Sequence, residues 1–264
     1  MKKRTAFLGA ILYLIPLGQT LIIKTGVAVS SVIIISHSEK VNAEGLHFFS
    51  YSDYFESALE KGEKGDHFGA ISDYTKVLEI NPKKTEAYYN RGISKEALED
   101  YKGALEDYEK ALLINPDDYL NWQGVGRVKS FIGDYYGSIS ALNSSIELNP
   151  NYGEAYYNRG IVKEVLEDYK GALEDYEKAL LINPDNYLNW QAVGTVKIFI
   201  GDFNGSISAL NSSIELNPNN AGAYKNRGIS KSFIGDLVGA CADWRQSVSL
   251  FPNEDAAKLV SDQC

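Results

Sequence analysis

The sequence predicts an all-α solenoid, a stack of repeated helix-turn-helix units, on the strength of three observations. Residues 85–118 return almost unchanged as residues 153–186, with substitutions at four of the 34 positions. The diverged segment 119–152 lies between these copies and recurs as residues 187–220. Every proline except Pro16 falls on one 34-residue register: Pro82, Pro116, Pro150, Pro184, Pro218 and Pro252. Such a period is typical of stacked repeats, because a single unit cannot bury its apolar face and needs neighbours to complete a core.

The first 43 residues indicate export or membrane attachment. Lys2, Lys3 and Arg4 precede the apolar run 6–23, and Ala43 offers a small residue at a candidate cleavage point. This order is typical of a secretory signal peptide. The apolar run also approaches the roughly 20 residues that span a bilayer, so a retained anchor stays open, as does neither role. A signal or an anchor would engage the export machinery or the membrane. The repeats would then lie outside the cytoplasm, in a periplasmic, luminal or extracellular position.

Residues 44–50 are predicted to be a linker into the repeats, and the chain from residue 44 onward is acidic. The whole chain has 26 Lys+Arg and 35 Asp+Glu, a formal net charge of −9. Five of these basic residues and one acidic residue lie in residues 1–43, which leaves 21 against 34 and a net charge of −13 for the remainder. Nucleic-acid binding depends on basic side chains that neutralise phosphates. The charge therefore argues against a nucleic-acid partner.

The first half of the unit 85–118 is predicted to be a helix over residues 86–98. Gly92 lies inside this helix, where glycine costs about 1 kcal/mol relative to alanine. The glycine returns at the equivalent position of later units: Gly126, Gly160, Gly194 and Gly228. We therefore expect a partner helix to approach closely at Gly92, with Ala104 as the matching small residue.

The second half of the unit is also predicted to be helical. Its apolar residues lie at i, i+1, i+4, i+7 and i+8, on one helix face: Ala104, Leu105, Tyr108, Ala111 and Leu112. Glu106 and Asp107 are predicted to lie on the opposite, solvated face. Asn115 should end the helix, because the proline that follows it has no N–H and disfavours α geometry in the preceding residue. Asp117 or Asp118 can then cap the next helix.

The last residues, 253–264, are predicted to cap the stack with a short helix over 254–263. Ala257 and Val260 are spaced to pack on the last repeat. Solenoids commonly end in such an element, because their terminal repeat would otherwise expose its apolar face.

Cys241 and Cys264 lie at equal distances in sequence from the turn at Pro252–Asn253. Residues equidistant from the turn of an antiparallel helix pair lie at the same level, so a disulfide between these cysteines is expected. Export would permit the bond. The alternative is a buried small residue at position 241 and an unrelated terminal thiol.

The 34-residue unit resembles the tetratricopeptide repeat, in which a large aromatic residue is followed by Leu-Gly, then Tyr, and later by Ala, an aromatic residue and Pro. The first aromatic position is filled in every unit: Tyr54, Tyr88, Trp122, Tyr156, Trp190 and Tyr224. The resemblance implies a right-handed α-α superhelix of six repeats: 51–84, 85–118, 119–152, 153–186, 187–220 and 221–252. Arg91 and Lys95, with their equivalents, depart from the usual Leu and Tyr. Their long apolar stems are predicted to cover a helix contact while the charge reaches water.

In tetratricopeptide repeat proteins the first helix of each repeat lines a concave groove that holds partner segments, so the resemblance implies a protein or peptide ligand. Carried over by position, the groove-lining residues are Tyr89, Asn90, Ile93, Glu96, Leu120, Gln123, Arg127, Phe131, Tyr157, Asn158, Ile161, Glu164, Leu188, Gln191, Thr195, Phe199, Lys225, Asn226 and Ile229. Asn and Gln can bond the backbone of an extended peptide, and aromatic rings supply contact area. The other interpretation is that some of these residues only cover neighbouring helices.

Catalytic and metal-binding patterns are missing from the sequence. Its histidines lie towards the N-terminus and its cysteines at the far end, so no cluster has the spacing of metal ligands. No serine stands in a nucleophile elbow or a P-loop. Three Asn-x-Ser triplets recur with the repeats and are interpreted as structural: Asn143, Asn204 and Asn211. The sequence therefore predicts no enzyme and no cofactor, but an exported or membrane-tethered scaffold that binds protein or peptide. The alternative is a structural spacer or self-assembling solenoid without a groove ligand.

Overall fold

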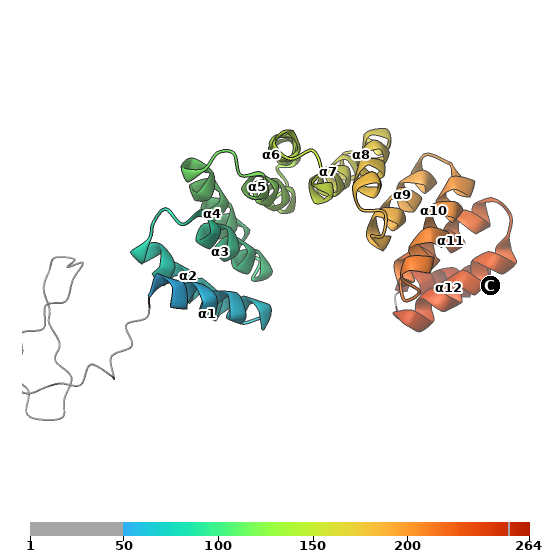
Figure 1. The fold of residues 1–264 in the computed structure, drawn as a ribbon. Helices are drawn as coiled ribbons and strands as arrows, with labels where there is room; N and C mark the ends of the chain where they lie inside the picture. The colour runs from blue at the N-terminus through green and yellow to red at the C-terminus, as the bar shows by residue number, and fades with distance from the viewer. Residues whose placement is uncertain (1–49, 253) are drawn as a thin grey trace, which may run out of the picture. The chain divides into compact units, whose positions relative to one another are not determined.

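The computed structural model describes residues 50–252 and 254–264. The predicted signal or anchor segment and residues 44–49 of the linker lie outside the described residues. The described part belongs to one compact unit and contains thirteen α-helices. Figure 1 shows the helices following one another in chain order, each pair stacked beside the next. None of the helices described is both long and apolar enough to cross a membrane.

Twelve of these helices form six pairs whose first members begin 34 residues apart. The first helices are α1 (Tyr51–Glu63), α3 (Thr85–Ala97), α5 (Tyr119–Phe131), α7 (Gly153–Val165), α9 (Tyr187–Phe199) and α11 (Ala221–Phe233). The second helices are α2 (His67–Ile80), α4 (Tyr101–Ile114), α6 (Tyr135–Leu148), α8 (Tyr169–Ile182), α10 (Phe203–Leu216) and α12 (Leu237–Leu250). A last helix, α13 (Glu254–Gln263), follows α12. The predicted all-α solenoid of helix pairs with a C-terminal capping helix is confirmed.

Aspartates start the second helix of each pair. In α4 the Asp100 carboxylate accepts a hydrogen bond of 3.0 Å from the Gly103 N–H, which would otherwise be unpaired at the helix start. The other second helices begin in the same way, at Asp66, Asp134, Asp168, Asp202 and Asp236. Asn115 ends α4 as predicted, and Asp118 caps α5 through two backbone N–H groups. The helix boundaries therefore follow from local capping chemistry.

Glycine lets the two helices of each pair approach closely, as predicted. A Cβ atom placed on Gly92 would lie 2.7 Å from the Tyr108 ring, so no larger residue fits without a shift. Four later pairs repeat this contact between a glycine and a large side chain: Gly126–Leu142, Gly160–Tyr176, Gly194–Leu210 and Gly228–Trp244. The large partners are almost fully buried, so these contacts form the core of each pair.

The prediction that Asp107 faces solvent is wrong, since its side chain is 0% exposed. Arg91 on α3 donates two hydrogen bonds to it, Nε to Oδ2 at 2.8 Å and Nη2 to Oδ1 at 2.6 Å, and Lys95 Nζ lies 2.8 Å from Oδ2. Arg91 Nη1 also donates to Thr75 on α2, so one side chain joins three helices. Burying a carboxylate is costly unless cations and hydrogen bonds replace its water. The pairing gives Arg91 and Lys95 a role that the predicted apolar cover leaves out.

This buried ion pair recurs in every second repeat. Arg159 pairs with Asp175 and Arg227 with Asp243 in the same geometry. The remaining guanidinium nitrogen of each arginine bonds an asparagine of the preceding repeat, Asn143 or Asn211. These asparagines therefore have the structural role predicted for their triplets. The repeats in between hold buried apolar residues at the same two positions: Val125 with Ala141, and Val193 with Ala209. Two kinds of repeat alternate along the chain.

Successive pairs are joined through their first helices. Direct contacts link α1 to α3, α3 to α5, α5 to α7 and α9 to α11, while each second helix packs against the first helix of the next pair. Stacked rings seal three of these junctions: Tyr101–Phe131, Tyr169–Phe199 and Phe203–Phe233, with centroids 4.9, 4.8 and 4.5 Å apart. The first helices consequently lie side by side and present a common surface.

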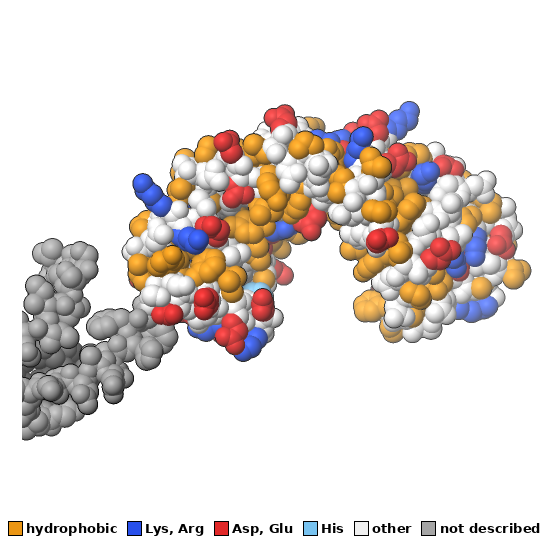
Figure 2. All heavy atoms as spheres, in the orientation of Figure 1, with side chains coloured by type: hydrophobic (Ala, Val, Ile, Leu, Met, Phe, Trp, Pro, Cys, Tyr) orange, Lys and Arg blue, Asp and Glu red, His pale blue; other side chains and the backbone are white. Residues whose placement is uncertain are grey.

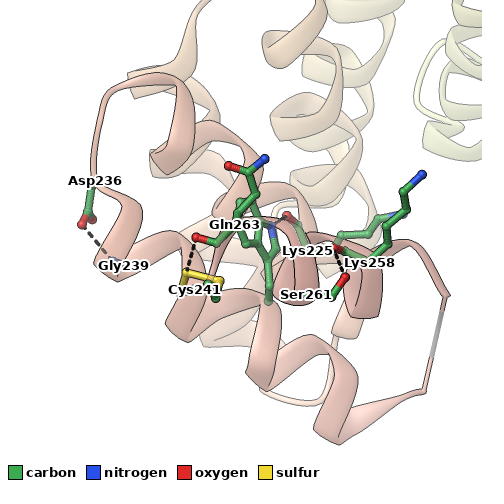
Figure 3. Close-up of a disulfide and its surroundings, with 9 residues drawn as sticks. Lys225, Asp236, Gly239, Cys241, Lys258, Ser261 and Gln263 are labelled. Carbon is green, nitrogen blue, oxygen red and sulfur yellow. Dashed lines mark hydrogen bonds between the residues drawn. A yellow bond between two sulfur atoms is a disulfide. The ribbon is translucent and has the colours of Figure 1, made fainter.

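The capping helix α13 packs on α12 and is fastened there by the predicted disulfide. Cys241 and Cys264 are bonded, with their Cα atoms 5.7 Å apart, and Figure 3 shows the bond between the two helices. Val260 packs on the last repeat as predicted. Ala257 does not, because the buried alanine is Ala256, four residues before Val260 and on the same face of α13.

Candidate functional site

The surface made by the first helices carries exposed apolar side chains at several of the positions predicted to line a groove. Ile93 and Ile161, which are equivalent in the two near-identical repeats, are 38% and 39% exposed. Phe131, Leu188 and Phe199 are exposed as well. Figure 2 shows hydrophobic side chains gathered in patches over the helix pairs, with charged residues between them. A row of exposed apolar residues is typical of a surface that receives a partner.

Tyr89 and Tyr157 lie half in this surface and half in the core. The Tyr89 ring centroid is 5.7 Å from that of Tyr108, and the Tyr157 centroid is 5.5 Å from that of Tyr176. The adjacent asparagines are half-buried too: Asn90 and Asn158. Both tyrosines therefore contribute to helix packing, and their role in binding a partner stays a prediction.

Gln123 does not lie on the surface where the sequence placed it. Its side chain is 1% exposed, and neither amide atom has a hydrogen-bond partner among the described residues. The equivalent Gln191 accepts a hydrogen bond of 2.7 Å from the Asn220 amide. Tyr152 occupies the position of Asn220 in the earlier block, and its hydroxyl bonds Glu154 instead. The exchange of Asn for Tyr therefore buries Gln123 without an amide partner.

Arg127 is engaged by its own chain. Its Nε and Nη2 donate to the two carboxylate oxygens of Glu96 on α3, at 2.7 and 2.8 Å. Glu96 also accepts a hydrogen bond from the Tyr108 hydroxyl. Burial opposes the charged guanidinium, but the hydrogen bonds and charge of Glu96 outweigh it and raise the pKa of Arg127 above its ordinary value. Arg127 thus fills the space between α3 and α5.

Two predicted residues of the last repeat also have partners within the chain. The Asn226 amide donates a hydrogen bond of 2.8 Å to the Thr195 hydroxyl and so joins α11 to α9. Lys225 Nζ lies 3.4 Å from the exposed Asp255 carboxylate on α13. A surface ion pair of this kind contributes little to stability, so Lys225 remains accessible to a partner.

A cleft of about 420 Å³ opens between α7, α8 and α9. The structure brings together here seven of the residues predicted to line a groove: Tyr157, Ile161, Glu164, Leu188, Gln191, Thr195 and Phe199. Four further lining residues were not predicted, because their repeat positions suggested helix contacts or no role: Val165, Tyr169, Tyr176 and Ala192. The cleft therefore combines aromatic and aliphatic walls with one amide and one carboxylate.

Glu164 is the acidic group of this cleft, and its environment differs from that of Glu96. The Tyr176 hydroxyl donates a hydrogen bond of 2.9 Å to it. Burial raises the pKa of the Glu164 carboxyl, while the hydrogen bond from Tyr176 lowers it less. Thr195 stands at the position that Arg127 holds in the earlier block. Within the described part of the chain, no cation lies at ion-pair distance from Glu164.

A second cleft, of about 460 Å³, lies between α8, α9 and α10, on the opposite face of α9. Leu180, Trp190 and Val193 form much of its apolar wall, and Lys197 and Glu177 contribute charges. The sequence assigned this face to helix packing. Across the described residues, no group of three or more His, Cys, Asp or Glu is arranged to hold a metal ion.

The comparisons with known proteins agree with this architecture. A family model described as "Tetratricopeptide repeat" matches residues 85–118 and 153–186. Together with six helix pairs at a 34-residue spacing, this match identifies the chain as a tetratricopeptide repeat protein. A comparison with curated proteins finds no match.

Solved structures with a similar fold include three that cover most of the helical part. A crystal structure of MamA is 26% identical, with 65% of this chain and 93% of that chain covered and a TM-score of 0.55. YrrB, described as a tetratricopeptide repeat protein with an unusual peptide-binding site, is 21% identical, with 71% and 97% covered and a TM-score of 0.58. PilF of Pseudomonas aeruginosa is 18% identical, with 81% and 97% covered and a TM-score of 0.72. The last two show the likeness of fold alone.

Proposed function

We propose that this protein is a non-catalytic scaffold that binds an extended peptide or protein segment on the surface of its first helices. The cleft between α7 and α9 carries the proposal. It is concave, walled by Tyr157, Leu188 and Phe199, and supplied with an amide at Gln191 and a carboxylate at Glu164. Apolar walls with a few convergent polar groups are what a binding site for a flexible ligand requires.

Two further observations support a peptide as the ligand. The peptide-binding site reported for YrrB lies on a protein of the same fold. The net charge of −13 from residue 44 onward favours a neutral or basic partner, mainly because opposite charge speeds association. The near-identity of residues 85–118 and 153–186 also places similar side chains twice along the surface, which suits an extended ligand.

The test is a pair of matched double variants. Phage-displayed random decapeptides are selected on the full chain, and their affinity is measured by calorimetry. Ile93→Asp/Ile161→Asp changes the first-helix surface and should weaken binding at least about tenfold, because each charge must be desolvated against the ligand. Leu113→Asp/Leu181→Asp alters residues that are 85% and 77% exposed on the second helices, and should leave binding unchanged.

The opposite result would contradict the proposal. If the second-helix variant loses binding and the first-helix variant keeps it, the ligand lies on the other face, where the cleft lined by Trp190 is the next candidate. If no selected peptide binds the folded chain, the alternative of a structural spacer gains support. Circular dichroism of both variants must match the unaltered protein for either reading.

We also propose that the protein is exported or tethered outside the cytoplasm by residues 1–43. The basic start and apolar run of this segment support the proposal, and so does the bond between Cys241 and Cys264, because disulfides persist mainly in oxidising compartments. Intact-mass measurement of protein from its native source is the test. A mature chain that begins at Glu44 is expected for a cleaved signal, and a full-length chain that needs detergent selects the anchor. A full-length, soluble cytoplasmic chain would refute both.

A further inference from the structure

We propose that the cleft between α7 and α9 binds an arginine side chain of the partner, with its guanidinium paired to Glu164. The inference rests on the proposed peptide-binding function and names the side chain that this site selects. It is carried by a difference between two otherwise equivalent places in the same chain, described below.

The first of these places, between α3 and α5, shows how a guanidinium fits. Arg127 lies between the two helices and donates two hydrogen bonds, of 2.7 and 2.8 Å, to the oxygens of Glu96. The same carboxylate accepts the Tyr108 hydroxyl, so its charge is fully used. Paired hydrogen bonds between a guanidinium and a carboxylate are strong and fix the geometry of both groups.

The second place keeps the acceptor and lacks the donor. Glu164 and Tyr176 stand at the positions of Glu96 and Tyr108, and they are hydrogen-bonded to each other in the same way. Thr195 replaces Arg127, and its hydroxyl is turned to the Gln191 carbonyl and the Asn226 amide. The space that Arg127 occupies in the earlier block is thus open in the cleft. A partly buried carboxylate without a counter-charge gains stability from a cation that enters.

The walls of the cleft favour arginine over lysine. Tyr169 and Phe199 form a stacked pair at one end, with ring centroids 4.8 Å apart, and Tyr157 lies within the same cleft. A guanidinium is planar and weakly hydrated, so it can stack on rings while it bonds a carboxylate, whereas an ammonium is compact and strongly hydrated. The chain uses this preference itself, since Arg159 lies over the Tyr156 ring at 5.5 Å.

The experiment uses three blocked peptides that differ at one position: Ac-Ala-Ala-X-Ala-Ala-Ala-NH2 with X as arginine, lysine or citrulline. Citrulline has nearly the shape of arginine without its charge. Binding to the isotope-labelled full chain is followed by NMR titration. The arginine peptide should bind about tenfold or more tightly than the citrulline peptide, the range expected for hydrogen bonds to a charged group. The lysine peptide should fall between them.

Three variants test the site. Glu164→Gln removes the charge and should weaken the arginine peptide about tenfold, with little effect on the citrulline peptide. Thr195→Arg supplies the missing guanidinium from within and should abolish binding of the arginine peptide. Thr195→Ala is the matched control, because it loses the same hydrogen bond to Asn226 but leaves the space open, and should bind as the unaltered chain does.

Several results would overturn the inference. Equal affinity for arginine and citrulline peptides would do so, and so would full binding by Thr195→Arg with unchanged circular dichroism. If selected decapeptides bind but the arginine peptide does not, the arginine site is refuted while the peptide-binding surface stands. If no peptide of either kind binds the folded chain, both proposals fail. Self-association that Glu164→Gln abolishes would make a second copy the occupant, in place of a separate partner.

Discussion

Arg91 holds Asp107 by two parallel hydrogen bonds at a position where the carboxylate has no contact with solvent. The pair lies between helices α3 and α4, and the third guanidinium nitrogen reaches α2. A charged residue thereby joins two repeats at the place where the repeat pattern usually has leucine. The consequence for stability follows from what remains when one partner is removed.

Asp107→Ala should destabilise the protein by roughly 3–5 kcal/mol, because Arg91 and Lys95 would be left with unpaired charges in a buried position. The matched control is Glu106→Ala, one residue earlier on the exposed side of α4, where about 0.5 kcal/mol or less is expected. Urea denaturation followed by circular dichroism measures both. Equal midpoints for the two variants would show that the buried pair contributes nothing.

Two helical glycines should respond to alanine in opposite directions. At Gly92 a Cβ atom would lie 2.7 Å from the Tyr108 ring, so Gly92→Ala should cost about 1–3 kcal/mol through overpacking, partly offset by better helix propensity. At Gly62, in α1, a Cβ atom meets nothing within 4 Å, and Gly62→Ala should stabilise by up to about 1 kcal/mol. Thermal melting of both variants is the measurement. A stabilised Gly92→Ala would mean that the Tyr108 ring moves aside freely.

Asp73 should make the first repeat sensitive to acid. Burial raises the pKa of its carboxyl, but hydrogen bonds from Lys61, Ser57 and Lys76 outweigh burial and hold the pKa below its ordinary value of 3.8. The unfolded chain therefore binds a proton at higher pH than the folded chain does, and stability falls as the pH drops. The contribution of Asp73 is present above about pH 4 and is lost as the pH falls through the lowered value.

The variant Asp73→Asn should be less stable than the unaltered protein at pH 7, and the difference should shrink towards pH 2. Urea midpoints measured across this range decide the matter. Ser57→Ala removes one of the three donors and should give an intermediate slope. A difference that stays constant with pH would exclude Asp73 as the titrating group.

The disulfide should stabilise the end of the stack without affecting its beginning. The two cysteines are 23 residues apart, and closing a loop of this size contributes on the order of 3 kcal/mol in the chain-entropy model. Reduction should therefore speed hydrogen exchange in α13 and α12 and leave α1 to α4 unchanged, because repeats interact with their nearest neighbours. Thiol counting on the unfolded native protein should find no free thiol. Two free thiols, or uniform loosening along the chain, would contradict this account.

The period and the apolar stripe were enough to predict the helices, because each repeat is stabilised by contacts that return every 34 residues. They were not enough to place Asp107, since a helix-face argument treats every carboxylate as solvated. One signal could have revealed the pair. Arg91 and Asp107 occur together in repeats two, four and six, and repeats three and five carry Val and Ala at the same positions.

The predicted groove residues show a different limit. Position within a repeat correctly gave the helix on which each residue lies, but not whether its side chain is already engaged. Arg127 is consumed by Glu96, and Gln123 is buried because Tyr152 replaces an asparagine one repeat away. Such outcomes depend on pairs of residues in adjacent repeats. They can be read from the sequence only when the register between repeats is known.

The alternation of repeats with a buried Arg–Asp pair and repeats with Val and Ala sets the step by which this chain can grow or shrink. Duplicating or deleting 68 residues preserves the order of the two kinds of junction. Deleting only residues 119–152 would bring Arg159 against Glu109, where the intact chain offers it the neutral Asn143. Recombination between gene segments would thus be tolerated in double units, and the copying of a 68-residue block that the sequence displays is the kind of event that such a rule lets survive.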